Sequence, residues 1–309
     1  LFIPIKPQTT LIVFDEVQEM PRALTSLKYF CEEAPEYAIC CAGSLLGIAL
    51  HEGTSFPVGK TDFLHLYPLT FKEFLLANGE QMLVDYIQQG NRNVKAFEPR
   101  LIDYLKRYMI VGGMPAVVNE WLDTKDFTKV EKIQKQLIAA YQKDFSKHAP
   151  HQMVEKIRYV WNSITSQLAK ENKKFVYGLV REGARAREYE DALQWLVNGQ
   201  LVHKIYRCNK PNLPIAAYDD LSAFKIYLSD VGLLRRLSQL DPSAFIEGNR
   251  LFTEFKGALS ENYVLQALVN QFEVTPRYWS QNNPPYEVDF LIQRANDIFP
   301  ILRQLLPPE

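Results

Sequence analysis

The 309-residue sequence lacks several features that mark specialised classes of protein. No apolar stretch reaches the ~20 residues that a membrane-spanning helix needs, and no basic segment precedes an apolar one as in a signal peptide. The four cysteines contain no Cys-x-x-Cys spacing, which argues against a zinc knuckle or a redox dithiol. The formal net charge is only -1, so the chain as a whole does not attract nucleic acid or anionic lipid. These absences predict a cytoplasmic protein with reduced thiols and no membrane partner.

What the sequence does contain is typical of a globular protein. Hydrophobic residues make up 47% of the chain and charged residues 23%, which argues against disorder and against fibrous structure. A chain of this length exceeds what one hydrophobic core usually serves, so two or three domains are expected. The order of the predicted elements gives an α/β plus helical fold class.

The N-terminal region contains a predicted strand–helix–strand unit. Leu11–Phe14 is a run of apolar residues without alternation, which predicts a strand buried on both faces of a parallel sheet. A helix with Pro21 near its first turn is predicted up to Glu33, and residues 37–42 form the next apolar strand. This order is that of a βαβ unit.

A further strand and helix are predicted before residue 78. Residues 63–67 are rich in apolar and aromatic side chains and predict a third strand. Thr70 and Glu73 have capping-box spacing and predict the start of a helix.

Two carboxylates directly follow the first predicted strand. Asp15 and Glu16 stand where P-loop ATPases carry the Walker B acids, at the carboxyl end of a buried apolar strand. In that role Asp15 would hold Mg²⁺ and Glu16 would orient and polarise the attacking water. Ser44 follows the next strand, where a polar side chain would sense the γ-phosphate, because ligands bind at the carboxyl ends of parallel strands. The alternative is a strand that simply ends in polar residues.

Gly59-Lys60-Thr61 resembles the end of a phosphate-binding loop but does not fit its pattern. That loop has a glycine, four residues and then Gly-Lys-Ser/Thr. The preceding glycine here is Gly53, one position too early, and Thr54 stands where the glycine should be. We therefore do not expect this stretch to hold phosphate.

Nine motifs together resemble one known family. They are LIVFDEVQ at 11–18, AGSLLG at 42–47, FPVGKTDFLHLYPLTFKEFL at 56–75, YMIVGGMP at 108–115, QKDFSKH at 142–148, ARAREYEDALQWL at 184–196, KIYLSDVGLL at 225–234, GALSENYVLQAL at 257–268 and YWSQNNPPYEVDFLI at 278–292. With them the chain resembles the AAA-type ATPases of bacteria and archaea that carry a characteristic C-terminal domain of unknown function. The resemblance covers nearly the whole chain.

This resemblance implies a Walker A loop some tens of residues before Walker B. The loop is then expected upstream of residue 1, in a missing N-terminal segment that would act as a partner of this chain. The intact protein is expected to use ATP and magnesium as an ATP hydrolase, and the 309 residues alone are expected to be inactive. Residues 1–78 would be the rear part of a RecA-like P-loop ATPase sheet, followed by a helical region at 79–150.

Residues 151–240 are predicted to form a winged helix, since helices precede a hairpin with strands at 201–206 and 215–218. Basic residues outnumber acidic ones over 170–187, which would suit contact with DNA phosphates. Glu188, Glu190 and Asp191 follow at once and would repel DNA. Two alternatives stay open. One is an adaptor that binds DNA or a protein partner through 170–210 and uses nucleotide as a switch. The other is a winged helix whose role is packing or contact with a partner, without DNA binding.

Residues 241–309 resemble an incomplete nuclease-like module of the PD-(D/E)xK type. Glu261 on a predicted helix and Asp289 on a predicted strand match the first acids of that fold. The strand at 298–301 should then lead into Glu-x-Lys, but Leu-Arg-Gln follows at 302–304. Phosphodiester cleavage needs a carboxylate cluster and a lysine, so this truncated module argues against metal chemistry. A nuclease-related protein remains the third alternative.

Overall fold

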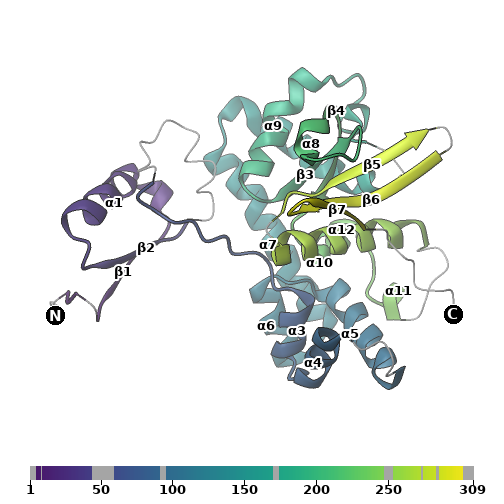
Figure 1. Ribbon diagram of the computed structural model, residues 1–309, viewed down its shortest axis with the longest axis horizontal. Coiled ribbons are helices and arrows are strands. Elements are labelled where there is room, and N and C mark those ends of the chain that lie inside the picture. Colours follow the sequence, from purple (N-terminus) through teal and green to yellow (C-terminus); the bar gives the residue numbers. More distant parts are fainter. Residues whose placement is uncertain are drawn as a thin grey trace. The chain divides into compact units, whose positions relative to one another are not determined.

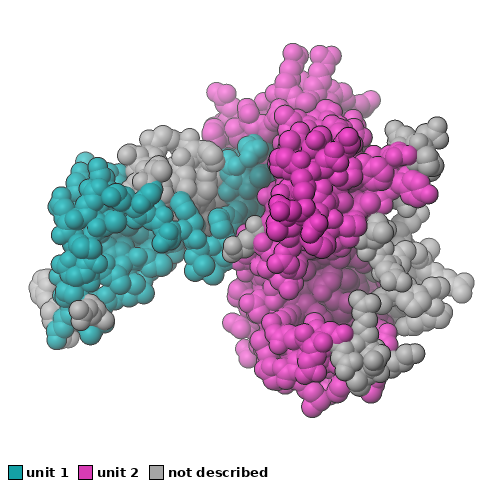
Figure 2. Space-filling model, in the orientation of Figure 1, with its two compact units in different colours: residues 1–66, 194–201 teal, residues 67–193, 202–309 magenta. Residues whose placement is uncertain are grey.

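The computed structural model describes residues 5–7, 9–43, 59–90, 95–169, 174–246, 253–272, 274–282 and 285–301. These residues form a mixed α/β fold with many helices and two sheets (Figure 1). The chain divides into unit 1, residues 1–66 and 194–201, and unit 2, residues 67–193 and 202–309 (Figure 2). At this level the predicted α/β plus helical class is confirmed.

Unit 1 is built on a parallel pair of strands, β1 (Leu11–Phe14) and β2 (Ala38–Cys41). Helix α1 (Pro21–Glu33) connects them and begins with a proline, whose missing N–H costs nothing in the first turn. The short 3-10 helix η1 (Val17–Glu19) lies between β1 and α1. The predicted strand–helix–strand unit is therefore confirmed.

The burial of β1 differs from the prediction. Leu11 and Val13 are 61% and 56% exposed, whereas Ile12 and Phe14 are half-buried. On the half-buried face the ring of Phe14 meets that of Phe30 in α1, with centroids 6.5 Å apart. The expectation of burial on both faces is wrong for the described residues, because they cover only one face of the pair.

The predicted strand at 63–67 is also wrong. These residues form no regular element, and Leu64 and Leu66 are 86% and 87% exposed. A strand needs a backbone partner, and the described sheet of unit 1 pairs only β1 with β2. The capping box that follows is confirmed: the Glu73 N–H donates to Thr70 Oγ1 at 3.2 Å and the Thr70 N–H donates to the Glu73 carboxylate at 2.7 Å.

The helices beyond this cap make up most of unit 2. They are α3 (Phe71–Ala77), α4 (Gln81–Gln89), α5 (Glu98–Val111), α6 (Pro115–Thr124), α7 (Phe127–His148), α8 (His151–Ala169), α10 (Val231–Leu237), α11 (Ser243–Ile246) and α12 (Thr253–Phe272), while α9 (Ala186–Asn198) has residues in both units. Helix α5 ends at Gly112, whose φ of 77° lies in the region that favours glycine, and Pro115 starts α6. Over the described ranges, no helix has the length and apolar character that crossing a bilayer demands.

Unit 2 contains a five-stranded sheet in the order β4-β3-β5-β6-β7. Its strands are β3 (Val202–Cys208), β4 (Asp219–Leu228), β5 (Arg277–Asn282), β6 (Pro285–Arg294) and β7 (Asp297–Ile301). Only the β3–β5 pair is parallel; the other neighbours run antiparallel. One sheet therefore continues across position 240, where the sequence predicts a boundary between a winged helix and a nuclease-like module. The predicted domain limits remain predictions.

The return strand of the ribbon lies later than predicted. Residues 215–218 form the 3-10 helix η4 (Ile215–Tyr218), and the strand that pairs with β3 starts at Asp219, opposite Cys208. The Ile215 N–H donates to Gln293 Oε1 of β6 at 2.9 Å instead of to β3. A side chain on a distant strand thus accepts the hydrogen bond that the Ile215 N–H would have donated in a local hairpin.

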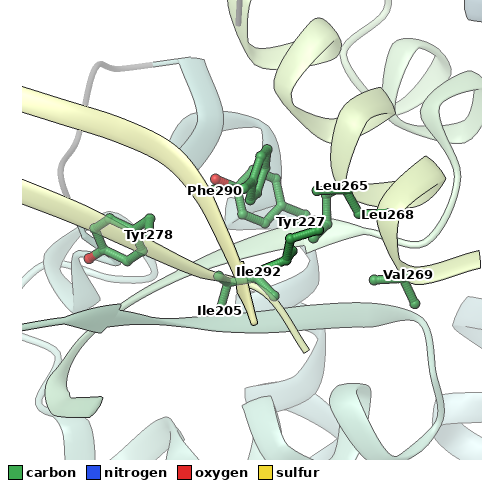
Figure 3. Packing of buried hydrophobic residues seen from close by; sticks show 8 residues of the cluster. All are labelled: Ile205, Tyr227, Leu265, Leu268, Val269, Tyr278, Phe290 and Ile292. Atoms are coloured by element: carbon green, nitrogen blue, oxygen red, sulfur yellow. The ribbon is translucent and has the colours of Figure 1, made fainter. Parts of the chain in front are cut away.

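One hydrophobic core cluster of unit 2 lies between α12 and the sheet (Figure 3). Three α12 side chains pack against five from the strands: Leu265, Leu268 and Val269 against Ile205, Tyr227, Tyr278, Phe290 and Ile292. Burying each large apolar side chain contributes ~1.5–3 kcal/mol, so this contact fixes α12 firmly on the sheet.

Candidate functional site

Asp15 and Glu16 form a turn at the carboxyl end of β1, and this turn is tied to the end of β2. The Ala42 N–H donates to the Phe14 carbonyl at 2.8 Å, and the Val17 N–H donates to the Ala42 carbonyl at 3.0 Å. Because β1 and β2 are parallel, their carboxyl ends meet at the same edge of the sheet. The two carboxylates therefore sit beside the chain that leaves β2.

The two acids are held differently although they are adjacent. Asp15 Oδ1 accepts a hydrogen bond from the Glu16 N–H at 3.0 Å. Glu16 Oε2 accepts one from Gln18 Nε2, and the backbone of Glu16 is left-handed, with φ 48°. A left-handed conformation costs a residue with a Cβ ~1–2 kcal/mol, so the rest of the fold must offset this conformational free energy at Glu16. Both acids are exposed and within reach of a ligand.

The sequence analysis considered two further residues for contact with phosphate, Ser44 and Lys60. Ser44 lies outside the described residues, which end at Gly43 on this side of the gap. Lys60 lies within them and forms an ion pair with Glu32 of α1, with 3.6 Å between Nζ and Oε1. No helix begins directly after Lys60 in the described chain, as one would after a phosphate-binding loop.

The carboxylates at this edge of the sheet are of the chemical type that binds magnesium. Mg²⁺ is commonly held by one or two carboxylates together with phosphate oxygens and water. Across the described ranges, no group of three or more His, Cys, Asp or Glu side chains is placed to hold a metal ion. The carboxylate of Asp15 is therefore a ligand of the type that magnesium takes when it also binds phosphate groups.

Three family models match parts of the chain. Residues 1–75 match the AAA domain. Residues 102–244 match the Domain of unknown function (DUF8612), and residues 256–302 match the Domain of unknown function (DUF4143). The AAA match contains β1, α1 and β2 and supports an AAA-type ATPase, as the motifs in the sequence indicate.

Among solved structures, the Walker-type ATPase PABY2304 of Pyrococcus abyssi is similar to this chain. The two share 16% identity and a TM-score of 0.43 over 74% of this chain. The match spans 63% of that protein's length. No curated protein matches the chain.

A second cluster of charged residues lies where α12 meets the sheet of unit 2. Lys225 Nζ on β4 is 3.0 Å from Glu261 Oε1 on α12 and 2.7 Å from Glu287 Oε1 on β6. The Tyr227 hydroxyl also donates to Glu261 Oε1, at 2.5 Å. Burial, then Glu261 and then Asp289 raise the pKa of Tyr227 well above its ordinary value. Glu261 therefore contacts Tyr227 directly, and the charge of Asp289 acts on the same tyrosine.

Lys225 is the member of this cluster that the sequence analysis did not single out. The sequence pattern places the expected lysine after residue 301, whereas in the structure a lysine reaches Glu261 from β4. Burial opposes its charge, but the carboxylates of Glu261 and Glu287 outweigh burial and raise its pKa. The available clue was the alternation along β4, which places Lys225 and Tyr227 on the same face.

The basic residues expected to meet DNA have varied surroundings. Positions 170–173, with Lys170 and Lys173, lie outside the described residues. The guanidinium of Arg181 lies 5.8 Å from the ring centroid of Tyr159. The Arg185 N–H donates to the Glu188 carboxylate at 3.1 Å, so an acidic side chain already lies at the start of α9.

Proposed function

We propose that the intact protein binds Mg·ATP and hydrolyses it, with residues 1–78 as the rear part of the ATPase sheet. One observation supports this most directly. Asp15 and Glu16 lie at the carboxyl edge of a parallel strand pair inside the stretch that matches the AAA domain. In P-loop ATPases that edge is where a carboxylate helps to hold Mg²⁺ against the β- and γ-phosphates.

The proposal gives the three residues separate roles. Asp15 would hold the magnesium ion, which neutralises charge on the phosphates when bound. Glu16 would accept a proton from the attacking water, and Ser44 would contact the γ-phosphate. Asp15 and Glu16 have different hydrogen-bond partners, which supports different tasks for the two acids.

Glu16→Gln tests the catalytic role, because it keeps the size and the hydrogen bonding but removes the base. We expect ATP hydrolysis to slow by roughly 10²–10⁴-fold, the usual contribution of a general base, while ATP affinity stays close to that of the parent. Phosphate release and ATP binding by calorimetry measure the two quantities. Asp15→Asn is the matched variant and should instead weaken magnesium-dependent binding. Hydrolysis at the parent rate by Glu16→Gln would show that the pair is only a polar strand end.

The same assay should be run on the 309-residue chain and on a chain extended upstream of Leu1. Backbone N–H groups and a lysine from a Walker A loop supply most of the phosphate contacts in this class. We therefore expect the 309 residues alone to bind Mg·ATP weakly or not at all. Micromolar binding with hydrolysis by the 309 residues would overturn the proposal of an upstream loop.

We also propose the finer assignments, a winged helix over 151–240 and a PD-(D/E)xK-like module over 241–309. The order α8, α9, β3, β4 supports the first, and Glu261 and Asp289, which both raise the pKa of Tyr227, support the second. In this view the winged helix packs or binds a protein partner. DNA binding through 170–210 with a steep dependence on salt would favour the adaptor alternative instead.

A further inference from the structure

A cavity of about 670 Å³ lies within unit 2, beside α5, the turn from α6 to α7 and the end of α11. Its size falls in the range of small-molecule sites, ~300–1,000 Å³. Part of its wall is apolar, formed by Ile102, Trp121, Phe127 and Ile246. The rings of Trp121 and Phe127 are stacked with centroids 4.8 Å apart, which makes this part of the wall rigid.

Basic side chains form another part of the wall, and two of them approach the same ring. The guanidinium of Arg107 lies 5.9 Å and the ammonium of Lys125 lies 5.2 Å from a ring centroid of Trp121. Lys106 lines the cavity as well. Of the two acidic residues in the lining, Asp103 forms an ion pair with Arg107 at 2.7 Å. The other is Glu98, in the first turn of α5.

Lys125 is exposed, and its ammonium hydrogen-bonds a neutral group. Its ammonium donates to the neutral Asn78 Oδ1 at 3.0 Å, and the same oxygen accepts from Trp121 Nε1 at 3.2 Å. Although Lys125 is exposed, partial desolvation first, and then the like charge of Arg107, lower its pKa. An anion between Arg107 and Lys125 would offset both effects, because an opposite charge at short range favours the charged form.

The backbone of Lys125 adds an independent observation. It caps the C-terminus of α6 with φ 51°, in the left-handed region where glycine is the usual residue. A lysine is conformationally unfavourable there, and such local cost often accompanies a functional side chain.

We infer that this cavity binds a small organic anion, a carboxylate or phosphate that carries an apolar or aromatic body. The anionic group lies against Arg107 and Lys125, and the body lies against Ile102 and Ile246. All of these residues belong to unit 2. The inference therefore does not depend on ATP hydrolysis at Asp15 and Glu16.

A matched pair of fluorescent probes tests this site in the full chain. 8-Anilinonaphthalene-1-sulfonate carries an aromatic body and an anion, whereas N-phenyl-1-naphthylamine carries nearly the same body without the charge. We expect the sulfonate to bind at one saturable site and more tightly than the neutral probe. A carboxylate and a phosphate ester of naphthalene, used as competitors, distinguish the two anion types.

Lys125→Gly is the decisive variant, because glycine suits the left-handed backbone while the ammonium is lost. We expect it, combined with Arg107→Gln, to weaken sulfonate binding about tenfold, the loss typical of charged contacts that are partly solvated. Binding of the neutral probe should stay within about twofold, and the thermal midpoint of Lys125→Gly should not fall. Lys129→Gln removes an exposed charge outside the lining and serves as the control.

Three results would overturn the inference. Unchanged sulfonate affinity in the double variant would show that the cations do not contact an anion. An equal loss for the charged and the neutral probe would show an apolar surface without anion recognition. A lower thermal midpoint for Lys125→Gly would likewise mean that Lys125 supports the fold rather than a ligand.

Discussion

Replacing Gly113 with alanine tests how the chain is anchored where it enters unit 2. A Cβ at this position would lie 2.1 Å from the Leu69 carbonyl oxygen and 2.7 Å from the Leu69 nitrogen. Leu69 is itself held, because its N–H donates to the Gly113 carbonyl at 2.7 Å and its carbonyl accepts from the Tyr108 hydroxyl. The substitution must therefore push two hydrogen-bonded backbone segments apart.

The cost follows from the bonds that this movement disturbs. One is the bond between Leu69 and Gly113, and another runs from the Gly113 N–H to Asp230 Oδ2 at 2.7 Å. Asp230 is 0% exposed, so water cannot replace the lost donor. An unsatisfied buried group costs ~1–3 kcal/mol and more when it is charged, so we expect the free energy of unfolding to fall by ~3–5 kcal/mol.

Urea unfolding followed by far-ultraviolet circular dichroism measures this loss through the transition midpoint at an unchanged slope. Gly178→Ala is the matched control, because its new Cβ would meet only Val176 Cγ1, at 4.0 Å. We expect the control to stay within ~0.5 kcal/mol of the parent. A loss below ~1 kcal/mol for Gly113→Ala would refute the close approach of Leu69, since no buried bond would then have been broken.

Two further outcomes are expected. Burial lowers the pKa of His203 from 6.5 to about 4, so on acidification the unfolded chain takes up the proton first and stability is lost as the pH falls from 6.5 through 4. The loss is at most ~3 kcal/mol, and His203→Gln should show a shallower decline than the parent in urea titrations between about pH 7 and about pH 4; parallel curves would contradict the shift. We also expect no cleavage of plasmid DNA with Mg²⁺ or Mn²⁺, because Lys225 and Tyr227 already bond the Glu261 carboxylate. Cleavage that disappears in Asp289→Ala would be the contrary result.

Elements whose determinants lie close together in the sequence could be predicted. Thr70 and Glu73 satisfy each other's backbone groups within one turn, so their spacing alone specified the start of α3. Pro21 and Gly112 act through their own backbone geometry at the first residue of α1 and the end of α5. The strand pair β1 and β2 also followed from two short apolar runs with a helix between them.

The strand predictions that failed depended on distant partners. Residues 63–67 have the composition of a strand, but no strand among the described residues pairs with them. Ile215 has the expected β-forming side chain, yet its N–H bonds Gln293 across 78 positions of sequence. Local composition carries no information about which distant backbone will be available.

The charged cluster around Glu261 in unit 2 also depends on partners that are distant in the sequence. Glu261 and Asp289 could be singled out from their places on a helix and a strand, but their neighbour Lys225 comes from a strand that pairs elsewhere. The antiparallel pairing of β4 with β3 and the packing of α12 on the sheet together bring Lys225 to Glu261. Neither contact is encoded by spacing along the chain.

Two motifs that are far apart in the sequence meet at Asp230. Glycines in both motifs permit this contact. A Cβ on Gly112 would lie 2.2 Å from Asp230 Oδ1, and a Cβ on Gly232 would lie 2.5 Å from the Val111 carbonyl oxygen. The end of α5 and the start of α10 can therefore approach only because neither residue has a side chain. Asp230 caps α10 by accepting from the Leu233 N–H at 2.9 Å, and the close approach lets the same buried carboxylate also accept from the Gly113 N–H at 2.7 Å. The glycines in YMIVGGMP and KIYLSDVGLL thus permit one tertiary contact between segments that are far apart in the sequence.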